Sequence, residues 1–173
     1  MVPANFVLNH SNIPMATKGN TKLTEQERPL DMAGANIVVI KTAWNSHITD
    51  ELARGCIRVL KEHGVKVVER TVPGAVELTY GAQHFIRNHA GTNACIVLGC
   101  IIRGDTPHFD YVCQSVTQGI TLLNAQLPVP VIFGVLTVNT EVQALERIGG
   151  IHGHKGEEAA MTALQMIDFE RMG

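Results

Sequence analysis

The segment 103–110, RGDTPHFD, follows the long apolar run 94–102 and combines several residue types that can do chemistry. Thr106 is a typical N-cap and Pro107 a typical first helical residue, so we expect a helix to begin here. The free amides and the positive end of a helix bind anions such as phosphate. His108 would stand in the first turn, where an imidazole could transfer protons. The segment is therefore either an ordinary helix start or half of a functional site.

Two further segments place polar or aromatic side chains between a predicted strand and a predicted helix. Trp44, the only tryptophan, is followed by Asn45, and its indole could stack on a planar ligand or cover the edge of a sheet. Glu77 follows the turn 73–74 and lies at a helix start, a position that carboxylates favour for electrostatic reasons alone. Each segment supports a functional and a purely structural interpretation.

Two cations in the C-terminal part of the chain could complete an anion site. Arg147 and Lys155 could bind a phosphate together with the loop 104–106. Alternatively, Arg147 could neutralise the end of its own short helix, and Lys155 could be solvated. Nucleotide binding is not favoured, because the segment 99–104 lacks the Lys and Ser or Thr of a P-loop and no G-x-G-x-x-G follows a strand.

Hydrophobic periodicity predicts strands that alternate with helices. The strands are expected over residues 36–40, 65–72, 94–102 and 129–138. Helices are expected from Ser46 to Gly64, up to about Gly91, from Pro107 to Leu127, after the capping box Thr140-x-x-Gln143, and from about Lys155. The first three strands start at 36, 65 and 94, so each starts 29 residues after the one before, which is the length of a β-α-β unit.

Continuous apolar strands of this kind are covered on both faces. The expected fold is a three-layer α/β sandwich, a single flavodoxin-like domain in which helices flank a four-stranded parallel sheet. Ligands of such sheets bind beyond the carboxyl ends of the strands, where the segments above lie. Residues 1–34 lack any hydrophobic period, so we expect an N-terminal extension that is loose or docks on a neighbouring subunit.

The composition argues against several classes of protein. A net charge of −2 without a basic block is untypical of nucleic-acid binding, and no apolar stretch approaches the roughly 20 residues of a membrane span. The start shows no signal peptide, so we expect a cytoplasmic protein. His152 and His154 lack further ligands at suitable spacing, so no metal site is expected. Buried free thiols are expected at the four cysteines, which are Cys56, Cys95, Cys100 and Cys113.

Several long motifs resemble, in order and spacing, those of the lumazine synthase family. They are VPGAVEL (72–78), GCIIRGDTPHFDYVC (99–113), and FGVLTVNTEVQALERIGG (133–150) followed by HKGEEAA (154–160). The resemblance covers about residues 36–168, and it identifies residues 35–173 as a lumazine synthase domain.

The resemblance implies the penultimate reaction of riboflavin biosynthesis. In it, 5-amino-6-(D-ribitylamino)uracil condenses with 3,4-dihydroxy-2-butanone 4-phosphate to give 6,7-dimethyl-8-ribityllumazine, phosphate and water, without a metal or a redox cofactor. His108 matches the proton-transfer residue, and Trp44 stands where the family usually has a phenylalanine that stacks on the pyrimidine. Phe133 matches an aromatic from the neighbouring subunit. The other substrate-binding positions implied are Asn45, Ala75, Val76, Glu77, Cys100, Ile101 and Ile102, and the phosphate-binding positions are Gly104, Asp105, Thr106, Arg147 and Lys155.

The resemblance also implies a homo-oligomer. The family forms pentamers with sites between subunits, and some members build 60-subunit icosahedral shells that can enclose riboflavin synthase. The short, glycine-rich connection 147–155, RIGGIHGHK, is similar to that of shell-forming members, so a shell is favoured over a free pentamer or a decamer. The alternative function is a non-catalytic protein of the same fold that binds lumazine or flavin or forms a shell.

Overall fold

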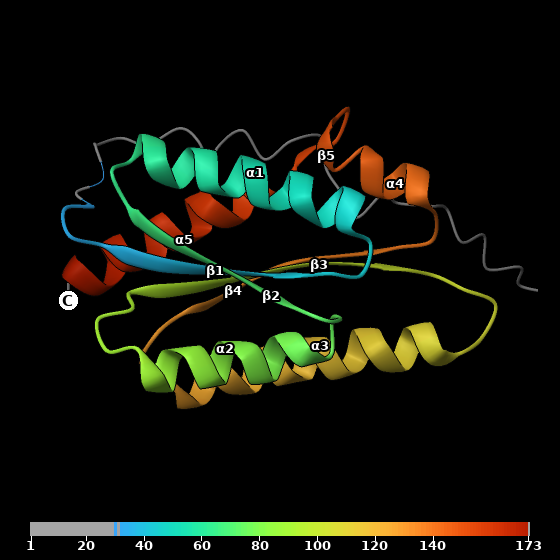
Figure 1. Ribbon diagram of the computed structural model, residues 1–173, viewed down its shortest axis with the longest axis horizontal. Coiled ribbons are helices and arrows are strands. Elements are labelled where there is room, and N and C mark those ends of the chain that lie inside the picture. Colours follow the sequence, from blue (N-terminus) through green and yellow to red (C-terminus); the bar gives the residue numbers. More distant parts are fainter. Residues whose placement is uncertain (1–29, 31, 173) are drawn as a thin grey trace, which may run out of the picture.

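The computed structural model describes Leu30 and residues 32–172, and it shows the expected α/β domain (Figure 1). Four parallel strands form one sheet in the order β2-β1-β3-β4. Their bounds are Asn36–Thr42 for β1, Lys66–Val72 for β2, Ala94–Ile102 for β3 and Val131–Val138 for β4. The three-layer sandwich with a four-stranded parallel sheet is therefore confirmed.

Helices cover both faces of the sheet, and Figure 1 shows the two helical layers on either side of it. One layer holds α1 (Ser46–Glu62) and α5 (Lys155–Met172), and the other holds α2 (Glu77–Asn88) and α3 (His108–Gln126). The short helix α4 (Glu141–Leu145) follows β4 and leads into a small antiparallel hairpin. The hairpin consists of β5 (Ile148–Gly150) and β6 (Gly153–His154).

Two hydrophobic cores lie on the two faces of the sheet, because successive strand residues point in opposite directions. Along β1, Ile37 and Val39 belong to the core under α1 and α5, whereas Val38 and Ile40 belong to the core under α2 and α3. Both faces being covered explains why the central strands are continuously apolar. The edge strand β2 differs, since most of its side chains are exposed.

The helix starts differ in part from the predictions. Asn45 rather than Ser46 occupies the N-cap position of helix α1, and no side chain caps this helix. Asn45 adopts a left-handed conformation with φ of 57° that turns the chain out of β1. Thr106 does not cap α3, because the cap position falls one residue later, at Pro107, and no side chain caps this helix. The capping box of Thr140 and Gln143 is confirmed.

Two glycine-dependent features were not expected. In the hairpin of β5 and β6, Gly149 lies at an irregularity of β5 (φ 111°) and Gly153 is the first residue of β6 (φ 79°), and other residues rarely adopt this backbone geometry. Gly156 at the start of α5 lies so close to α1 that a Cβ atom there would overlap the carbonyl oxygen of Leu52. This close approach lets α1 and α5 pack along the same face of the sheet.

Three of the sequence-based expectations concern the cysteines, membrane spans and metal binding. All four cysteines are free, with Cys56, Cys95 and Cys100 buried and Cys113 half-buried. Among residues 30 and 32–172, no helix combines the length and the apolar character needed to cross a membrane. The same residues contain no cluster of three or more side chains that could hold a metal ion.

The expected extension, residues 1–34, lies mostly outside the described residues. Of its described part, Met32 is only 3% exposed and packs into the core under α1 and α5. The packed domain therefore begins no later than Met32.

Candidate active site

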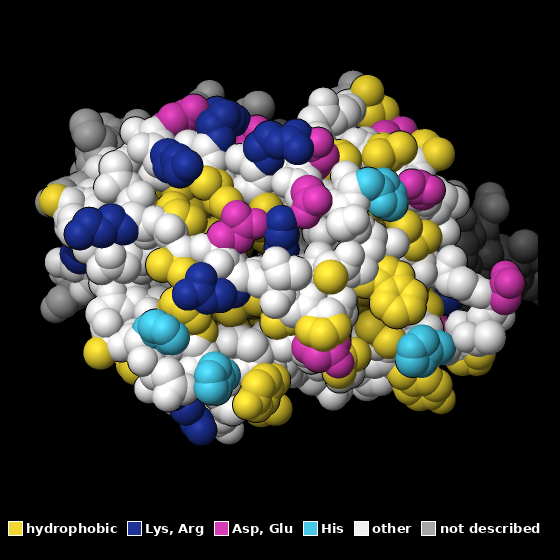
Figure 2. All heavy atoms as spheres, in the orientation of Figure 1, with side chains coloured by type: hydrophobic (Ala, Val, Ile, Leu, Met, Phe, Trp, Pro, Cys, Tyr) yellow, Lys and Arg dark blue, Asp and Glu magenta, His cyan; other side chains and the backbone are white. Residues whose placement is uncertain are grey.

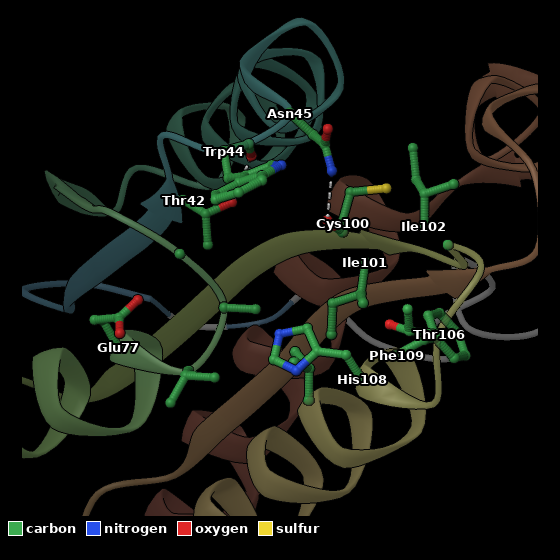
Figure 3. Close-up of a pocket in the computed structure, with 15 residues that line it drawn as sticks. Thr42, Trp44, Asn45, Glu77, Cys100, Ile101, Ile102, Thr106, His108 and Phe109 are labelled. Atoms are coloured by element: carbon green, nitrogen blue, oxygen red, sulfur yellow. Dashed lines mark hydrogen bonds between the residues drawn. The ribbon is translucent and has the colours of Figure 1, made fainter.

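A pocket of about 350 Å³ lies at the carboxyl ends of β1 and β3, between the starts of α1, α2 and α3 (Figure 3). Eleven of the fifteen sequence-predicted site residues line it. They are Trp44, Asn45, Ala75, Val76, Glu77, Cys100, Ile101, Ile102, Gly104, Thr106 and His108. The strand ends on which the sequence motifs lie thus form a single cavity, as expected for a parallel sheet.

The pocket opens because β3 extends beyond the residues that pair with β1. The pairing of β3 with β1 ends at Leu98 and Lys41, whereas its pairing with β4 continues to Ile102 and Val138. The last residues of β3 therefore lie next to open space on the β1 side, and there they form part of the pocket wall.

Trp44 is held at the rim by backbone hydrogen bonds that extend the pairing of β1 and β2. The Ala43 amide donates to Val72 O over 2.8 Å, and the Trp44 amide donates to Pro73 O over 3.0 Å. The Trp44 side chain is 74% exposed and borders the pocket. An exposed aromatic ring at a pocket rim is suited to stacking on a planar ligand.

Asn45 connects the two sides of the pocket. Its side-chain Nδ2 donates to the carbonyl oxygen of Cys100 over 2.9 Å, which Figure 3 shows as a dashed line. Its own carbonyl oxygen accepts from the amides of Ile48 and Thr49 in the first turn of α1. One residue thus starts α1 and also replaces the strand pairing that β1 and β3 lack at this point.

Cys100 lines the pocket but is not a nucleophile at neutral pH. Burial, together with the negative charge of Glu141, raises the pKa of the Cys100 thiol to about 11. Because the thiolate is the reactive form, this thiol stays protonated and weakly reactive. Its contribution to the pocket is its shape and its backbone carbonyl.

The starts of α2 and α3, which belong to the same helical layer, both border the cavity. Glu77 in the first turn of α2 and His108 in the first turn of α3 both line the pocket, and Figure 3 shows both of them below Trp44 and Asn45. The imidazole of His108 makes no hydrogen bond to any described residue and is exposed. It is therefore free to exchange protons with a bound ligand.

The loop before α3 offers unused hydrogen-bond donors. The amides of Gly104, Asp105 and Thr106 have no partner among the described residues, and Gly104 and Thr106 line the pocket. Unpaired amides in front of a helix start bind anionic oxygen atoms. Asp105 itself does not line the pocket, and its carboxylate would repel a phosphate, so only its backbone amide suits an anion.

Three other predicted site residues are not brought to the pocket of their own chain: Phe133, Arg147 and Lys155. Phe133 lies in the middle of β4, where it pairs with Val97 and packs half-buried against the core under α2 and α3. Arg147 follows α4, and Lys155 begins α5.

Arg147 is held in one orientation by Glu158. Its two terminal nitrogens each donate to a Glu158 oxygen over 2.8 Å, and one of them also donates to the carbonyl oxygen of His152. The ammonium of Lys155 is 3.7 Å from the same carboxylate. Burial alone would raise the pKa of Glu158, but the hydrogen bonds and charges of Arg147 and Lys155 outweigh it, and the pKa lies below its ordinary value.

Four further residues line the pocket that the sequence analysis did not single out. They are Thr42, Gly74, Phe109 and Val112. Phe109 directly follows His108, so an aromatic residue in the first turn of the same helix was the available signal. Thr42 is the last residue of β1, and its place at a strand end was likewise available.

Comparisons with known proteins identify the family. The family model described as 6,7-dimethyl-8-ribityllumazine synthase matches residues 34–171. A 6,7-dimethyl-8-ribityllumazine synthase of Porphyromonas gingivalis is 54% identical over 132 residues, which cover 75% of this chain and 81% of the relative. The synthase of Bacteroides fragilis is 49% identical over 134 residues, covering 76% and 93%. That of Parabacteroides distasonis is 49% identical over 142 residues, covering 80% and 88%.

The family match spans almost the whole described domain and includes every element that contributes to the pocket. Among solved structures, a GDSL-like lipase from Bacteroides thetaiotaomicron aligns with 65% of this chain and 54% of its own, at a TM-score of 0.37 and 13% identity, which says nothing about function. The family match and the identities of 49–54% decide the assignment. The chain belongs to the 6,7-dimethyl-8-ribityllumazine synthase family.

Proposed function

We propose that this chain condenses 5-amino-6-(D-ribitylamino)uracil with 3,4-dihydroxy-2-butanone 4-phosphate to 6,7-dimethyl-8-ribityllumazine, with release of phosphate and water. The single observation that carries the proposal is the pocket itself. It combines an exposed stacking ring, a set of free amides and an exposed histidine at the carboxyl ends of the strands. These three features suit the reaction, which by the family resemblance uses no metal or redox cofactor.

The phosphate substrate would be held by the loop before α3. The unpaired amides of Gly104, Asp105 and Thr106 lie at the positive end of a helix of 19 residues, which favours a doubly charged phosphate group. Holding the phosphate here would place the four-carbon chain of this substrate near His108. His108 would then transfer protons during imine formation, phosphate elimination and ring closure.

The pyrimidine substrate would occupy the other half of the pocket. Trp44 offers a stacking face, and the backbone of Cys100, Ile101 and Ile102 offers an edge for ring and side-chain hydrogen bonds. Ala75, Val76 and Glu77 would bind the ribityl chain, because hydroxyl groups pair well with a carboxylate and with backbone amides. Asn45 would contact the ring from the rim.

We further infer that a neighbouring subunit completes the site. Phe133, Arg147 and Lys155 lie away from the pocket of their own chain, so they would serve the pocket of a second copy. Exposed apolar side chains lie on both sides of Arg147 in the sequence, in α4 and in the hairpin. Figure 2 shows hydrophobic side chains gathered over these two elements. Val142 is 63% and Ile151 is 78% exposed, which is typical of a surface that another subunit covers.

The assembly would be a homo-oligomer of pentamers, with a 60-subunit shell as the favoured form and riboflavin synthase as a candidate enclosed partner. The residues that precede Leu30 would form an extension that is loose or docks on a neighbouring subunit. We expect this assembly to be cytoplasmic. Mass photometry at micromolar protein separates a pentamer, a decamer and a 60-subunit particle directly.

The test is an absorbance assay for lumazine formation from the two substrates, with His108→Ala and Arg147→Ala beside the parent. His108→Ala should retain part of the activity, because holding two reactants together can contribute roughly 7–11 kcal/mol, whereas proton transfer contributes about 100-fold to 10,000-fold. Arg147→Ala should mainly raise the KM of the phosphate substrate. A parent that binds lumazine or riboflavin tightly but never turns over would instead be a binding or shell-forming protein.

A further inference from the structure

Arg103 is the residue between β3 and the loop before α3, and it makes more directed contacts than any other described side chain near the pocket. It does not line the pocket itself. No role for it follows from the substrate contacts proposed above. Arg103 instead connects the chain segments that carry the proposed substrate-binding groups.

The guanidinium of Arg103 reaches forward to the first turn of α3. Its two terminal nitrogens donate to the two carboxylate oxygens of Asp110, over 2.8 and 3.3 Å. Its central carbon lies 4.1 Å from the centre of the Phe109 ring. A planar guanidinium that is both forked onto a carboxylate and stacked on a ring fixes the orientation of its partners, which a lysine ammonium cannot do.

The same side chain also bonds to the residue that follows β4, which is the sideways contact of Arg103. Its Nε donates to Asn139 Oδ1 over 3.0 Å, and the Arg103 amide donates to Val138 O over 2.9 Å. Asn139 is itself anchored, since its amide donates to Gln143 Oε1 of the α4 capping box over 2.8 Å. Arg103 therefore joins the end of β3, the end of β4 and the start of α3.

These contacts enclose the loop 104–107. Its first end is fixed by the pairing of Arg103 with Val138, and its last end is fixed by the fork onto Asp110. Between the two ends, the amides at 104–106 have no partner that would hold them in place. The direction of these amides, and of His108 two residues before Asp110, thus depends on the two fixed ends.

The geometry points to Arg103 as a positioning residue: it holds the loop 104–107 and the first turn of α3 so that the free amides and His108 face the same ligand. This inference rests on the proposed function, since it assigns Arg103 to the phosphate half of the proposed site. Arg103 acts through its neighbours and makes no contact with the substrate.

The test compares Arg103→Lys with Arg58→Lys. Arg58 is a matched control, because it is also an exposed arginine that donates to two groups, Glu62 and Glu157, and it lies away from the pocket. The two arginine side chains are 42% and 53% exposed. Both substitutions keep the charge and remove a planar guanidinium that bonds to two other residues, so they should cost similar stability.

Arg103→Lys should lower kcat/KM by about tenfold to 100-fold, since misplacing reacting groups by about 1 Å can cost about 100-fold. The KM of the phosphate substrate should rise while that of the pyrimidine stays the same, and Arg58→Lys should alter neither. Equal kinetics for the two variants, or an equal rise in both KM values, would overturn the assignment. If Arg103→Lys does not fold, Asn139→Ala removes the sideways contact alone and should shift the same KM.

A second measurement does not depend on turnover. Hydrogen–deuterium exchange of the ligand-free protein should be faster at the hydrogen-bonded amides of Arg103, Asp110 and Tyr111 in Arg103→Lys than in the parent, with other segments unchanged. Unchanged exchange at these three amides would refute the positioning role even if the parent is an active synthase. Faster exchange in a protein without turnover would uphold the positioning role and refute the proposed function.

Discussion

Substitutions at Asn45 separate two things that this residue does. Its backbone is left-handed, with φ of 57°, and its side chain donates to the carbonyl oxygen of Cys100, a residue that is only 5% exposed. Asn45→Gly keeps the left-handed turn and removes the hydrogen bond. Asn45→Ala removes the hydrogen bond and also forces a side chain into a backbone conformation that it avoids.

The magnitudes follow from these two contributions. Leaving a buried carbonyl without a partner costs about 1–3 kcal/mol, and the lower end applies because the pocket admits water. We therefore expect Asn45→Gly to lower the free energy of unfolding by about 1 kcal/mol. The left-handed conformation costs about 1–2 kcal/mol for a residue such as alanine, so Asn45→Ala should lose about 2–3 kcal/mol in total.

The assay is urea unfolding at one fixed protein concentration, because subunit association would otherwise change the apparent stability. Trp44 is the only tryptophan of the chain and adjoins Asn45, so its fluorescence reports the folded state of this edge of the pocket. Asn45→Asp provides a third comparison, since it fits the same shape but turns a carboxylate toward the Cys100 carbonyl. It should be less stable than Asn45→Gly and should bind the pyrimidine substrate more weakly.

Two results would contradict this account. If Asn45→Gly is as stable as the parent and binds the pyrimidine equally well, the hydrogen bond to Cys100 contributes nothing. If Asn45→Ala and Asn45→Gly are equally stable, the left-handed turn imposes no strain on a side chain. Either outcome would remove one of the two proposed contributions and leave the other to be tested alone.

Three further predictions concern packing, charge and thiol chemistry. Gly156→Ala should lower the free energy of unfolding by about 1–3 kcal/mol in thermal or urea unfolding, because its methyl would overlap the Leu52 carbonyl and push α5 from α1. The lowered pKa of Glu158 means that its ionised form stabilises the fold above the ordinary value of 4.5 and that this contribution is lost as the pH falls through the lower folded value. Unfolding measured from pH 7 to pH 3 should therefore depend less on pH in Glu158→Gln. Cys100 has a pKa of about 11, so iodoacetamide at pH 7 should label it slowly and Cys100→Ser should keep most of the turnover.

Much of the fold could be predicted from the sequence because its signals are local. The helix expected before Gly91 forms as α2 and buries Leu78, Ala82, Phe85 and Ile86, and the capping box of α4 forms as its motif indicated. Helix starts were less predictable. Asn45 displaced Ser46 as a cap because the exit of the chain from the sheet requires a left-handed residue there.

The sequence predicted only those site residues whose motifs directly follow the end of a strand. His108, Glu77 and Trp44 could be placed near one another, because parallel strands bring all their carboxyl ends to one edge. The sequence could not show that Arg147 would turn toward Glu158 and away from this pocket. The hairpin between these two residues sets that orientation, and it is too short to show a hydrophobic periodicity.

The sequence by itself determined the order of strands and helices, the two-sided covering of the sheet and the family, since each depends on residue type and spacing along the chain. Only the tertiary structure decided which polar groups from distant parts of the sequence form hydrogen bonds. The bond from Asn45 to Cys100 joins residues 55 positions apart, and the bond from Arg103 to Asn139 joins residues 36 apart. Such contacts depend on a few ångströms of strand offset and loop path, because a hydrogen bond forms only within a narrow range of distance and angle.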